Sequence, residues 1–206
     1  MKLRYLLPSL LILLFLIGCN NENSGQSSSG ELTKNTKIGN SLSADYNIPK
    51  SVEEIEKISE DIVEARVVNN ISIGIYDEKN GDIPSTITEL EVLQNYKGSF
   101  KKGKKIKVAE PYYLNDGSLE FIENYIPLQK NENYTIFLRG GHESDGISSI
   151  ISMGYGKYQE DFKEKQAEVT DFKTVGELEE LDFISPDNTL ITNYKSIKEN
   201  VFQIYE

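Results

Sequence analysis

Alternation between apolar and polar residues is the feature that most constrains how this chain can fold. Over residues 63–75 the odd positions are nearly all apolar, whereas the even positions include Glu64 and Arg66. A period of two over this length predicts a strand with one buried face. Gly74 indicates a bend or bulge near the end of that strand. The chain therefore has to bury at least one long strand against a core.

Further stretches of the same kind follow along the chain, and turn residues separate them. The first separator is an Asn80-Gly81 turn. Short strands are predicted over residues 86–96, 104–110, 119–125, 134–138 and 149–158. Six strands joined by turns predict a meander that closes into a small antiparallel barrel or sandwich.

Helical spacing occurs only at the two ends of this strand region. Ser51 and Glu54 form a capping box ahead of Val52, Ile55 and Ile58. A second capping box, Thr174 with Glu177, precedes Val175, Leu178 and Leu181. A terminal helix is predicted with one apolar face made of Tyr194, Ile197, Val201 and Ile204. The predicted fold class is therefore mainly β, with an N-terminal helix and one or two C-terminal helices.

The N-terminus has the pattern of a secretory signal. Two cations, Lys2 and Arg4, precede an apolar run over residues 5–17. This run is shorter than the roughly 20 residues of a membrane-spanning helix. The run ends in Leu16-Ile17-Gly18-Cys19, which closely resembles the lipobox of bacterial lipoproteins.

The lipobox resemblance implies that the chain is cleaved before Cys19 and that the Cys19 thiol carries S-diacylglycerol. N-acylation of the new terminus is an open possibility. The alternatives are an ordinary secretory signal with a chance cysteine, or an uncleaved anchor. We expect residues 1–18 to be a lipoprotein signal peptide, residues 19–45 a lipidated flexible tether rich in Ser, Gly, Asn and Lys, and residues 46–206 a single globular extracytoplasmic domain.

Charge narrows the classes of partner. The chain has 22 basic and 33 acidic residues, and loss of Lys2 and Arg4 with the signal leaves 20 against 33, or −13. Nucleic-acid binding needs cations to displace phosphate counterions, so we expect no nucleic-acid partner.

Cys19 is the only cysteine, which excludes disulfides within the chain. The 19 Lys against 3 Arg, 17 Asn and no Trp are typical of an AT-rich genome, and a Gram-positive bacterium is expected.

A second resemblance covers roughly residues 60–140. It is carried by Asp61-Ile62-Val63 with Val67-Val68, Leu90-x-Val92-Leu93-x-x-Tyr96-Lys97-Gly98, Gly103-x-x-Ile106-x-Val108 and Tyr134-Thr135-Ile136-Phe137-Leu138. The pattern resembles uncharacterised secreted bacterial domains and is similar to the OB-fold barrel of netrin and metalloproteinase-inhibitor modules. This resemblance implies an OB-like barrel. The inhibitors chelate a protease metal with a disulfide-fixed N-terminal cysteine, so their mechanism does not carry over to an acylated Cys19 without a partner cysteine.

His142, the only histidine, is the first candidate for chemistry. Together with Glu143 and Asp145 it could ligate a metal, or it could pair with Ser144. Zinc sites usually need three or four well-placed ligands, and a triad needs a third group and an oxyanion hole. A polar hairpin loop is the favoured interpretation. We expect no cofactor and no metal.

Two charged segments allow a functional and a structural interpretation. The acidic loop over residues 77–82 could bind calcium, but Lys79 and Gly81 occupy ligand positions of an EF-hand, so a surface turn is favoured. A lysine cluster could touch anionic lipid headgroups or wall polymers, although lysines also keep edge strands soluble. Its members are Lys101, Lys102, Lys104, Lys105 and Lys107.

Twelve tyrosines leave a related choice open. If Tyr112, Tyr113, Tyr155 and Tyr158 are exposed, they favour recognition of protein or sugar. Strand packing is the favoured interpretation.

The sequence thus predicts a membrane-anchored envelope lipoprotein on the extracytoplasmic face. Its domain is expected to be a non-catalytic binding module whose partners are the membrane and, in addition, another envelope protein or a wall polymer. The alternative is a lipid-anchored hydrolase or metal-dependent enzyme that uses Asp116, Glu120, Glu123 or His142.

Overall fold

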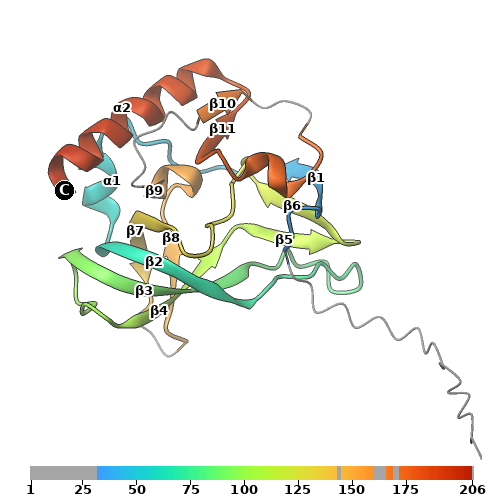
Figure 1. Cartoon of the computed structure of the whole chain (residues 1–206), viewed down its shortest axis with the longest axis horizontal. Helices are drawn as coiled ribbons and strands as arrows, with labels where there is room; N and C mark the ends of the chain where they lie inside the picture. Colours follow the sequence, from blue (N-terminus) through green and yellow to red (C-terminus); the bar gives the residue numbers. More distant parts are fainter. Residues whose placement is uncertain (1–31, 143–144, 160–165, 169–171, 206) are drawn as a thin grey trace, which may run out of the picture.

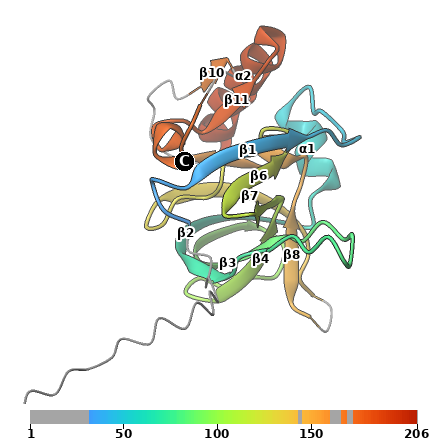
Figure 2. The same cartoon turned by 90° about the vertical axis from the view of Figure 1, so that its right-hand side faces the viewer.

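Five strands of the chain close into a barrel in the computed structural model, which describes residues 32–142, 145–159, 166–168 and 172–205. Closure occurs because the first strand of the barrel pairs with both the second and the fourth. Figure 1 and Figure 2 show the barrel from two sides. In order around the barrel, the strands are β2 (Asp61–Ser72), β3 (Thr86–Lys97), β4 (Lys105–Glu110), β8 (Ile147–Ile150) and β7 (Asn133–Gly140).

The strand order differs from a simple meander. β8 lies between β4 and β7, and it runs parallel to β4, while the other barrel ladders are antiparallel. The predicted class, a mainly β fold with a small barrel and peripheral helices, is confirmed. The narrower resemblance to netrin and inhibitor modules stays a prediction.

A second, three-stranded sheet lies beside the barrel. It consists of β1 (Lys37–Leu42), β6 (Ser118–Ile122) and β5 (Tyr112–Asn115), with β1 parallel to β6. Residues 37–42 were expected to be part of the flexible tether because they contain few bulky apolar residues. Backbone hydrogen bonds place them in the sheet instead, so the expected tether extends too far toward the C-terminus.

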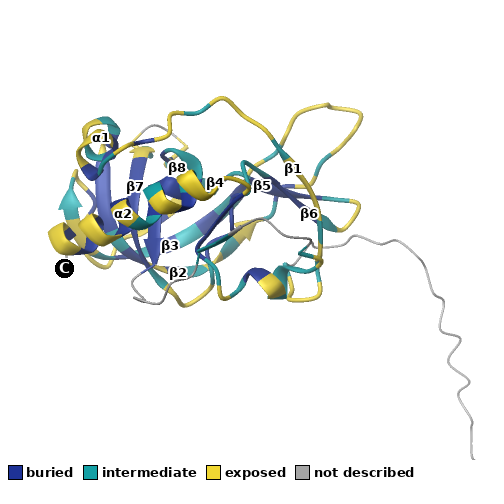
Figure 3. Ribbon diagram, turned by 90° about the horizontal axis from the view of Figure 1, so that it is seen from above, coloured by how far each residue is buried: buried dark blue, intermediate teal, exposed yellow. Residues whose placement is uncertain are grey.

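The barrel interior is filled by the alternating residues that the sequence pattern identified. Val63, Ala65 and Val67 of β2 are buried, as are Leu90 and Val92 of β3. Successive residues of a strand point to opposite faces, which is why one residue in two enters this core. Figure 3 shows the buried strands at the centre of the molecule.

A second apolar core lies on the outside of the barrel, beneath α1 (Val52–Ile58) and α2 (Asn188–Tyr205). Ile62 of β2 and Phe137 of β7 point outward into it. Tyr194 of α2 stacks on Phe183 with ring centroids 4.3 Å apart. This core explains how the helices are held against an otherwise closed barrel.

The buried face of α2 differs from the predicted one at its end. Tyr194, Ile197 and Val201 are buried as predicted, but Ile204 is 52% exposed and Tyr205 is buried instead. Tyr205 lies eleven residues after Tyr194, which is close to three full turns, whereas Ile204 falls off that face.

The remaining elements are short and connect the barrel to α2. The predicted strand over residues 149–158 is interrupted, because Ser152 and Met153 have φ of 54° and start a turn. The predicted helix after Thr174 is a single 3-10 turn. These elements are η1 (Met153–Gly156), β9 (Lys157–Gln159), β10 (Gln166–Glu168), η2 (Val175–Leu178) and β11 (Phe183–Ser185).

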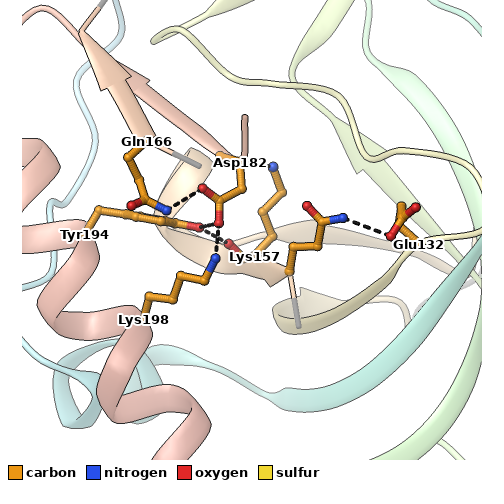
Figure 4. Close-up of polar contacts among 7 residues, drawn as sticks. Glu132, Lys157, Gln166, Asp182, Tyr194 and Lys198 are labelled. Atoms are coloured by element: carbon orange, nitrogen blue, oxygen red, sulfur yellow. Dashed lines mark hydrogen bonds and ion pairs between the residues drawn. The ribbon is translucent and has the colours of Figure 1, made fainter. Parts of the chain in front are cut away.

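A buried ionic cluster joins α2 to the strands, and Figure 4 shows its side chains converging on Asp182. One carboxylate oxygen of Asp182 accepts hydrogen bonds from Lys198 Nζ at 2.5 Å and from Tyr194 Oη at 3.3 Å. The other accepts a hydrogen bond from Gln166 Nε2 at 2.7 Å. Lys157 Nζ lies 3.5 Å from the Asp182 carbonyl oxygen, and burial lowers the pKa of Lys157 to about 8.

Candidate functional site

The candidate site is a groove at the end of the barrel where β2 continues beyond its partner β7. Residues 62–66 of β2 pair with strands on both sides, and Val67 still exchanges backbone hydrogen bonds with Asn131 and Glu132. After Val67 the ladder to β3 continues, with register shifts at 67/69 and 70/72. These irregularities turn the end of β2 away from the barrel interior.

The consequence is that isoleucines predicted to point inward lie at the surface. Ile71 is 46% exposed and Ile75 is 54% exposed. Period two predicted both as core residues, and that prediction is wrong because Ile71 lies in the irregular last residues of β2 and Ile75 lies beyond the end of the strand. Sequence analysis therefore missed the groove, although the apolar alternation itself marks its wall.

The groove has a volume of about 1120 Å³. This is slightly above the usual range of about 300–1,000 Å³ for ligand sites. Its lining is mixed, with polar side chains such as Asn69, Asn70 and Gln129 beside an apolar wall. The apolar lining residues are Leu32, Val67, Ile71, Ile73, Ile75, Ile126, Pro127, Leu128, Val175 and Leu178.

Three separate segments are held together at the groove rim. Lys34 Nζ and Glu179 Oε2 form an ion pair at 2.5 Å. Gln129 Nε2 donates to the Glu179 carbonyl oxygen at 2.8 Å. The ion pair is largely exposed and is worth about 1 kcal/mol or less. The rim is therefore fixed by several weak contacts, each between distant parts of the chain.

The wall formed by residues 126–132 is held from inside the barrel by Glu110. This carboxyl group is fully buried and accepts hydrogen bonds from Leu128 N at 2.8 Å and Tyr125 Oη at 3.0 Å. Its other oxygen contacts Thr88 Oγ1. Burial raises the pKa of Glu110 above its usual value. Thr88 Oγ1 also lies 2.9 Å from Asn70 Oδ1, an acceptor on the groove side.

One hydroxyl cannot donate its single proton to both neighbours. A protonated Glu110 removes the conflict, because its O–H donates to Thr88 and the Thr88 hydroxyl then donates to Asn70. The direction of the pKa shift agrees with this arrangement. Through these contacts Glu110, Thr88 and Asn70 connect the barrel interior to the groove.

Glu110→Gln is expected to change the free energy of unfolding by less than about 1 kcal/mol at neutral pH. The amide can donate to Thr88 and accept from Leu128 and Tyr125, as the protonated acid does. Urea unfolding of both proteins measures the difference. A loss of about 3 kcal/mol would instead mean that Glu110 is ionised and that the protein needs its charge.

No family model, curated protein or solved structure matches this chain.

Among the described residues, His142 contacts Asp61 and Phe100, and no contact with Asp145 is found. Its Nε2 lies 2.5 Å from Oδ2 of the buried Asp61, and its ring stacks on Phe100 with centroids 5.0 Å apart. Asp145 Oδ1 instead accepts a hydrogen bond from the backbone of Ile147. Glu143 and Ser144 lie outside the described residues. Among the residues that the structure describes, no three His, Cys, Asp or Glu side chains are grouped for a metal ion.

The carboxylates considered for acid–base chemistry lie in separate environments. Glu120 is bound by Tyr113 Oη at 2.8 Å and Asn115 Nδ2 at 3.1 Å. Glu123 Oε1 accepts a hydrogen bond from the backbone of Ala44. Asp116 has a φ of 47° and occupies the turn between β5 and β6. The structure therefore does not bring Asp116, Glu120, Glu123 and His142 together.

The lysine cluster occupies the hairpin between β3 and β4 and the start of β4. Lys105 Nζ pairs with Glu89 Oε1 at 2.7 Å, and Lys107 faces Glu89 in the β3–β4 register. Lys104 lies over the Phe100 ring at 4.8 Å. Lys101 and Lys102 are exposed. Part of the positive charge is therefore compensated by glutamates of the neighbouring strand.

The four tyrosines that could have been a recognition surface are core residues. Tyr112, Tyr113, Tyr155 and Tyr158 are all buried. Strand and core packing, the favoured interpretation, accounts for them.

The lipobox residues Leu16, Ile17, Gly18 and Cys19 lie outside the described residues. Within the part of the chain that the structure describes, no helix is both long enough and apolar enough to cross a bilayer.

Proposed function

We propose that this chain is a lipid-anchored, extracytoplasmic protein of the cell envelope, and that its domain is a non-catalytic binding module. The observation that carries the proposal is Leu16-Ile17-Gly18-Cys19 at the end of a short apolar run that follows two cations. The membrane is the first partner, through diacylglycerol on Cys19. Another envelope protein or a wall polymer is the second class of partner.

The binding site that the geometry supports best is the groove at the end of β2. It combines an apolar wall with amide side chains, which is the usual make-up of a ligand site. Two of its isoleucines are about half exposed, although large apolar side chains are usually buried. The proposal therefore assigns anchoring to Cys19 and binding to the groove.

Cys19→Ala is expected to lower the membrane-bound fraction of the protein about tenfold or more, because each buried CH₂ of an acyl chain contributes about 0.8 kcal/mol. Cell fractionation and metabolic labelling with an alkyne fatty acid measure the anchor directly. The circular dichroism of the domain should not change, because its strands and helices are formed by residues 37–205. Ser27→Ala, in the same N-terminal segment, is the matched control and should stay in the membrane.

A Cys19→Ala protein that remained in the membrane after signal cleavage would contradict the lipoprotein assignment. A wild-type protein without incorporated label would do the same.

A further inference from the structure

Three exposed isoleucines lie at or near one connection of the chain. Ile71, Ile75 and Ile83 are 46%, 54% and 50% exposed; Ile71 is the last residue but one of β2, and the other two lie between β2 and β3. The backbone of Ser85 and the ring of Pro84 pack against Gly74. That contact holds the two arms of the connection together. We name Ile71, Ile75 and Ile83 the isoleucine surface.

The described chain begins at this end of the barrel. Leu32, its first residue, lines the same groove as Ile71 and Ile75. Leu32 is the thirteenth residue after Cys19, so the chain between them spans at most about 45 Å even when fully extended. The segment that leads to Cys19 therefore leaves the domain at the groove that Ile71 and Ile75 line.

The lysine cluster is at the other end of the barrel. β3 runs from the isoleucine end to the β3–β4 hairpin, and its twelve residues correspond to about 40 Å of strand. Figure 1 shows the two connections at opposite ends of the barrel. To place the lysines on the membrane, the segment between Cys19 and Leu32 would have to extend along the whole domain.

We propose that the isoleucine surface contacts the lipid interface of the membrane that carries the Cys19 anchor. The inference rests on the proposed function, because it requires acylated Cys19. Exposed apolar side chains gain free energy on leaving water, at about 25 cal/mol for each Å². The short connection to the anchor raises their effective concentration at the bilayer. The lysine end of the barrel then points away from the membrane.

Charge gives this contact a definite lipid preference. The connection that carries the isoleucines also contains Asp77, Glu78 and Asp82 against one cation, Lys79. Anionic headgroups repel such a segment, so the contact is expected to be stronger on zwitterionic bilayers. A surface that used the lysine cluster would show the opposite preference.

The test uses the full acylated chain in phosphatidylcholine vesicles. The anchor blocks the thiol of Cys19, so a newly introduced cysteine is the single thiol that a fluorophore can label. One variant, Asp82→Cys, places the fluorophore near the isoleucine surface, and the other, Lys102→Cys, places it in the lysine cluster. With spin-labelled lipid in the bilayer, fluorescence at position 82 should be quenched several-fold more than at position 102. Replacing a third of the phosphatidylcholine by phosphatidylglycerol should reduce the quenching at position 82.

The matched variants compare isoleucines of similar exposure. A triple variant should abolish the excess quenching at position 82. It carries Ile71→Ser, Ile75→Ser and Ile83→Ser. Ile204→Ser on α2, where the side chain is 52% exposed, should leave it unchanged. Circular dichroism checks that the triple variant is folded.

Equal quenching at the two positions, or stronger quenching at 102, would overturn the inference while leaving the anchor in place. Mass spectrometry of the purified chain shows whether Cys19 carries diacylglycerol, and so distinguishes a wrong membrane-contact surface from a missing anchor. A Cys19 without diacylglycerol would overturn the proposed function and this inference together.

Discussion

Asp182→Ala is expected to lower the free energy of unfolding by about 3–5 kcal/mol, because it removes one partner from a buried ion pair. Asp182 is buried, and so is Lys198, whose Nζ donates to it at 2.5 Å. The same carboxylate accepts a hydrogen bond from Gln166 Nε2. Tyr194 Oη lies 3.3 Å from it but keeps the Lys157 carbonyl oxygen, at 3.1 Å, as an acceptor. Without Asp182, Lys198 and Gln166 lose this acceptor, and each loss costs about 1–3 kcal/mol.

The loss should affect the junction between α2 and the barrel first. Asp182 precedes β11, Lys198 is on α2, and Lys157, which donates to the Asp182 carbonyl, is on β9. The amide protons of α2 are therefore expected to exchange faster than those of β2 and β3 in the variant. Hydrogen exchange followed by mass spectrometry resolves these segments.

Two further variants test whether charge is the cause. Glu180→Ala removes an exposed carboxylate two residues away and should change the free energy of unfolding by less than about 0.5 kcal/mol. Asp182→Ala combined with Lys198→Met removes both charges and should be more stable than Asp182→Ala alone. If Asp182→Ala costs less than about 1 kcal/mol in urea unfolding, the cluster does not hold α2 in place.

The ionic cluster also shows where sequence reasoning stops. The main strands of the barrel follow from a local property, the period-two pattern, so residues 86–96 and 134–138 could be predicted. The order of the strands could not, because β8 reaches its place between β4 and β7 through pairings between residues far apart in the chain. From the sequence alone, charged residues such as Lys157 and Asp182 are expected at the surface, but the folded chain buries both.

The candidate site was missed for a related reason. Ile71 and Ile75 continue the alternation of Val63, Ala65 and Val67, and nothing local distinguishes them. Their exposure depends on where β7 ends, since its pairing with β2 stops at Arg66 and Asn133. Part of the same alternating pattern thus fills the core, and part of it lines the groove.

Alkaline pH is expected to unfold the domain because its tyrosines are buried as neutral phenols. Burial raises the pKa of nine tyrosines above the usual 10, to about 12 for Tyr46, Tyr113 and Tyr205. In the unfolded chain these groups lose their protons near pH 10. Their contribution to stability is therefore complete below pH 10 and is lost as the pH rises through the folded-state pKa values.

One group acts in the opposite direction over part of this range. The pKa of Lys157 is about 8 in the folded chain and 10.5 when unperturbed, so the folded state releases this proton first and stability rises between pH 8 and 10.5. A single lysine contributes at most about 1.4 kcal/mol per pH unit, and so does each tyrosine. Above pH 10 the stability lost through the nine tyrosines exceeds the stability gained through this one lysine.

The domain should therefore lose several kcal/mol between pH 10 and 12, which is enough to unfold a protein of ordinary stability. Phenolate absorbance at 295 nm should rise near pH 10 in urea-unfolded protein. In the native protein it should rise later and more steeply, together with loss of circular dichroism. Native and unfolded protein that titrated alike would show that the tyrosines are not protected.

Tyr158→Phe isolates the effect of one phenol. The Tyr158 hydroxyl is buried and has no hydrogen-bond partner among the described residues, so its removal should cost less than about 1 kcal/mol at pH 7. Because burial raises the pKa of Tyr158, the variant should unfold at a pH higher by about a few tenths of a unit. An unchanged or lower midpoint would mean that ionisation of this buried phenol does not drive alkaline unfolding.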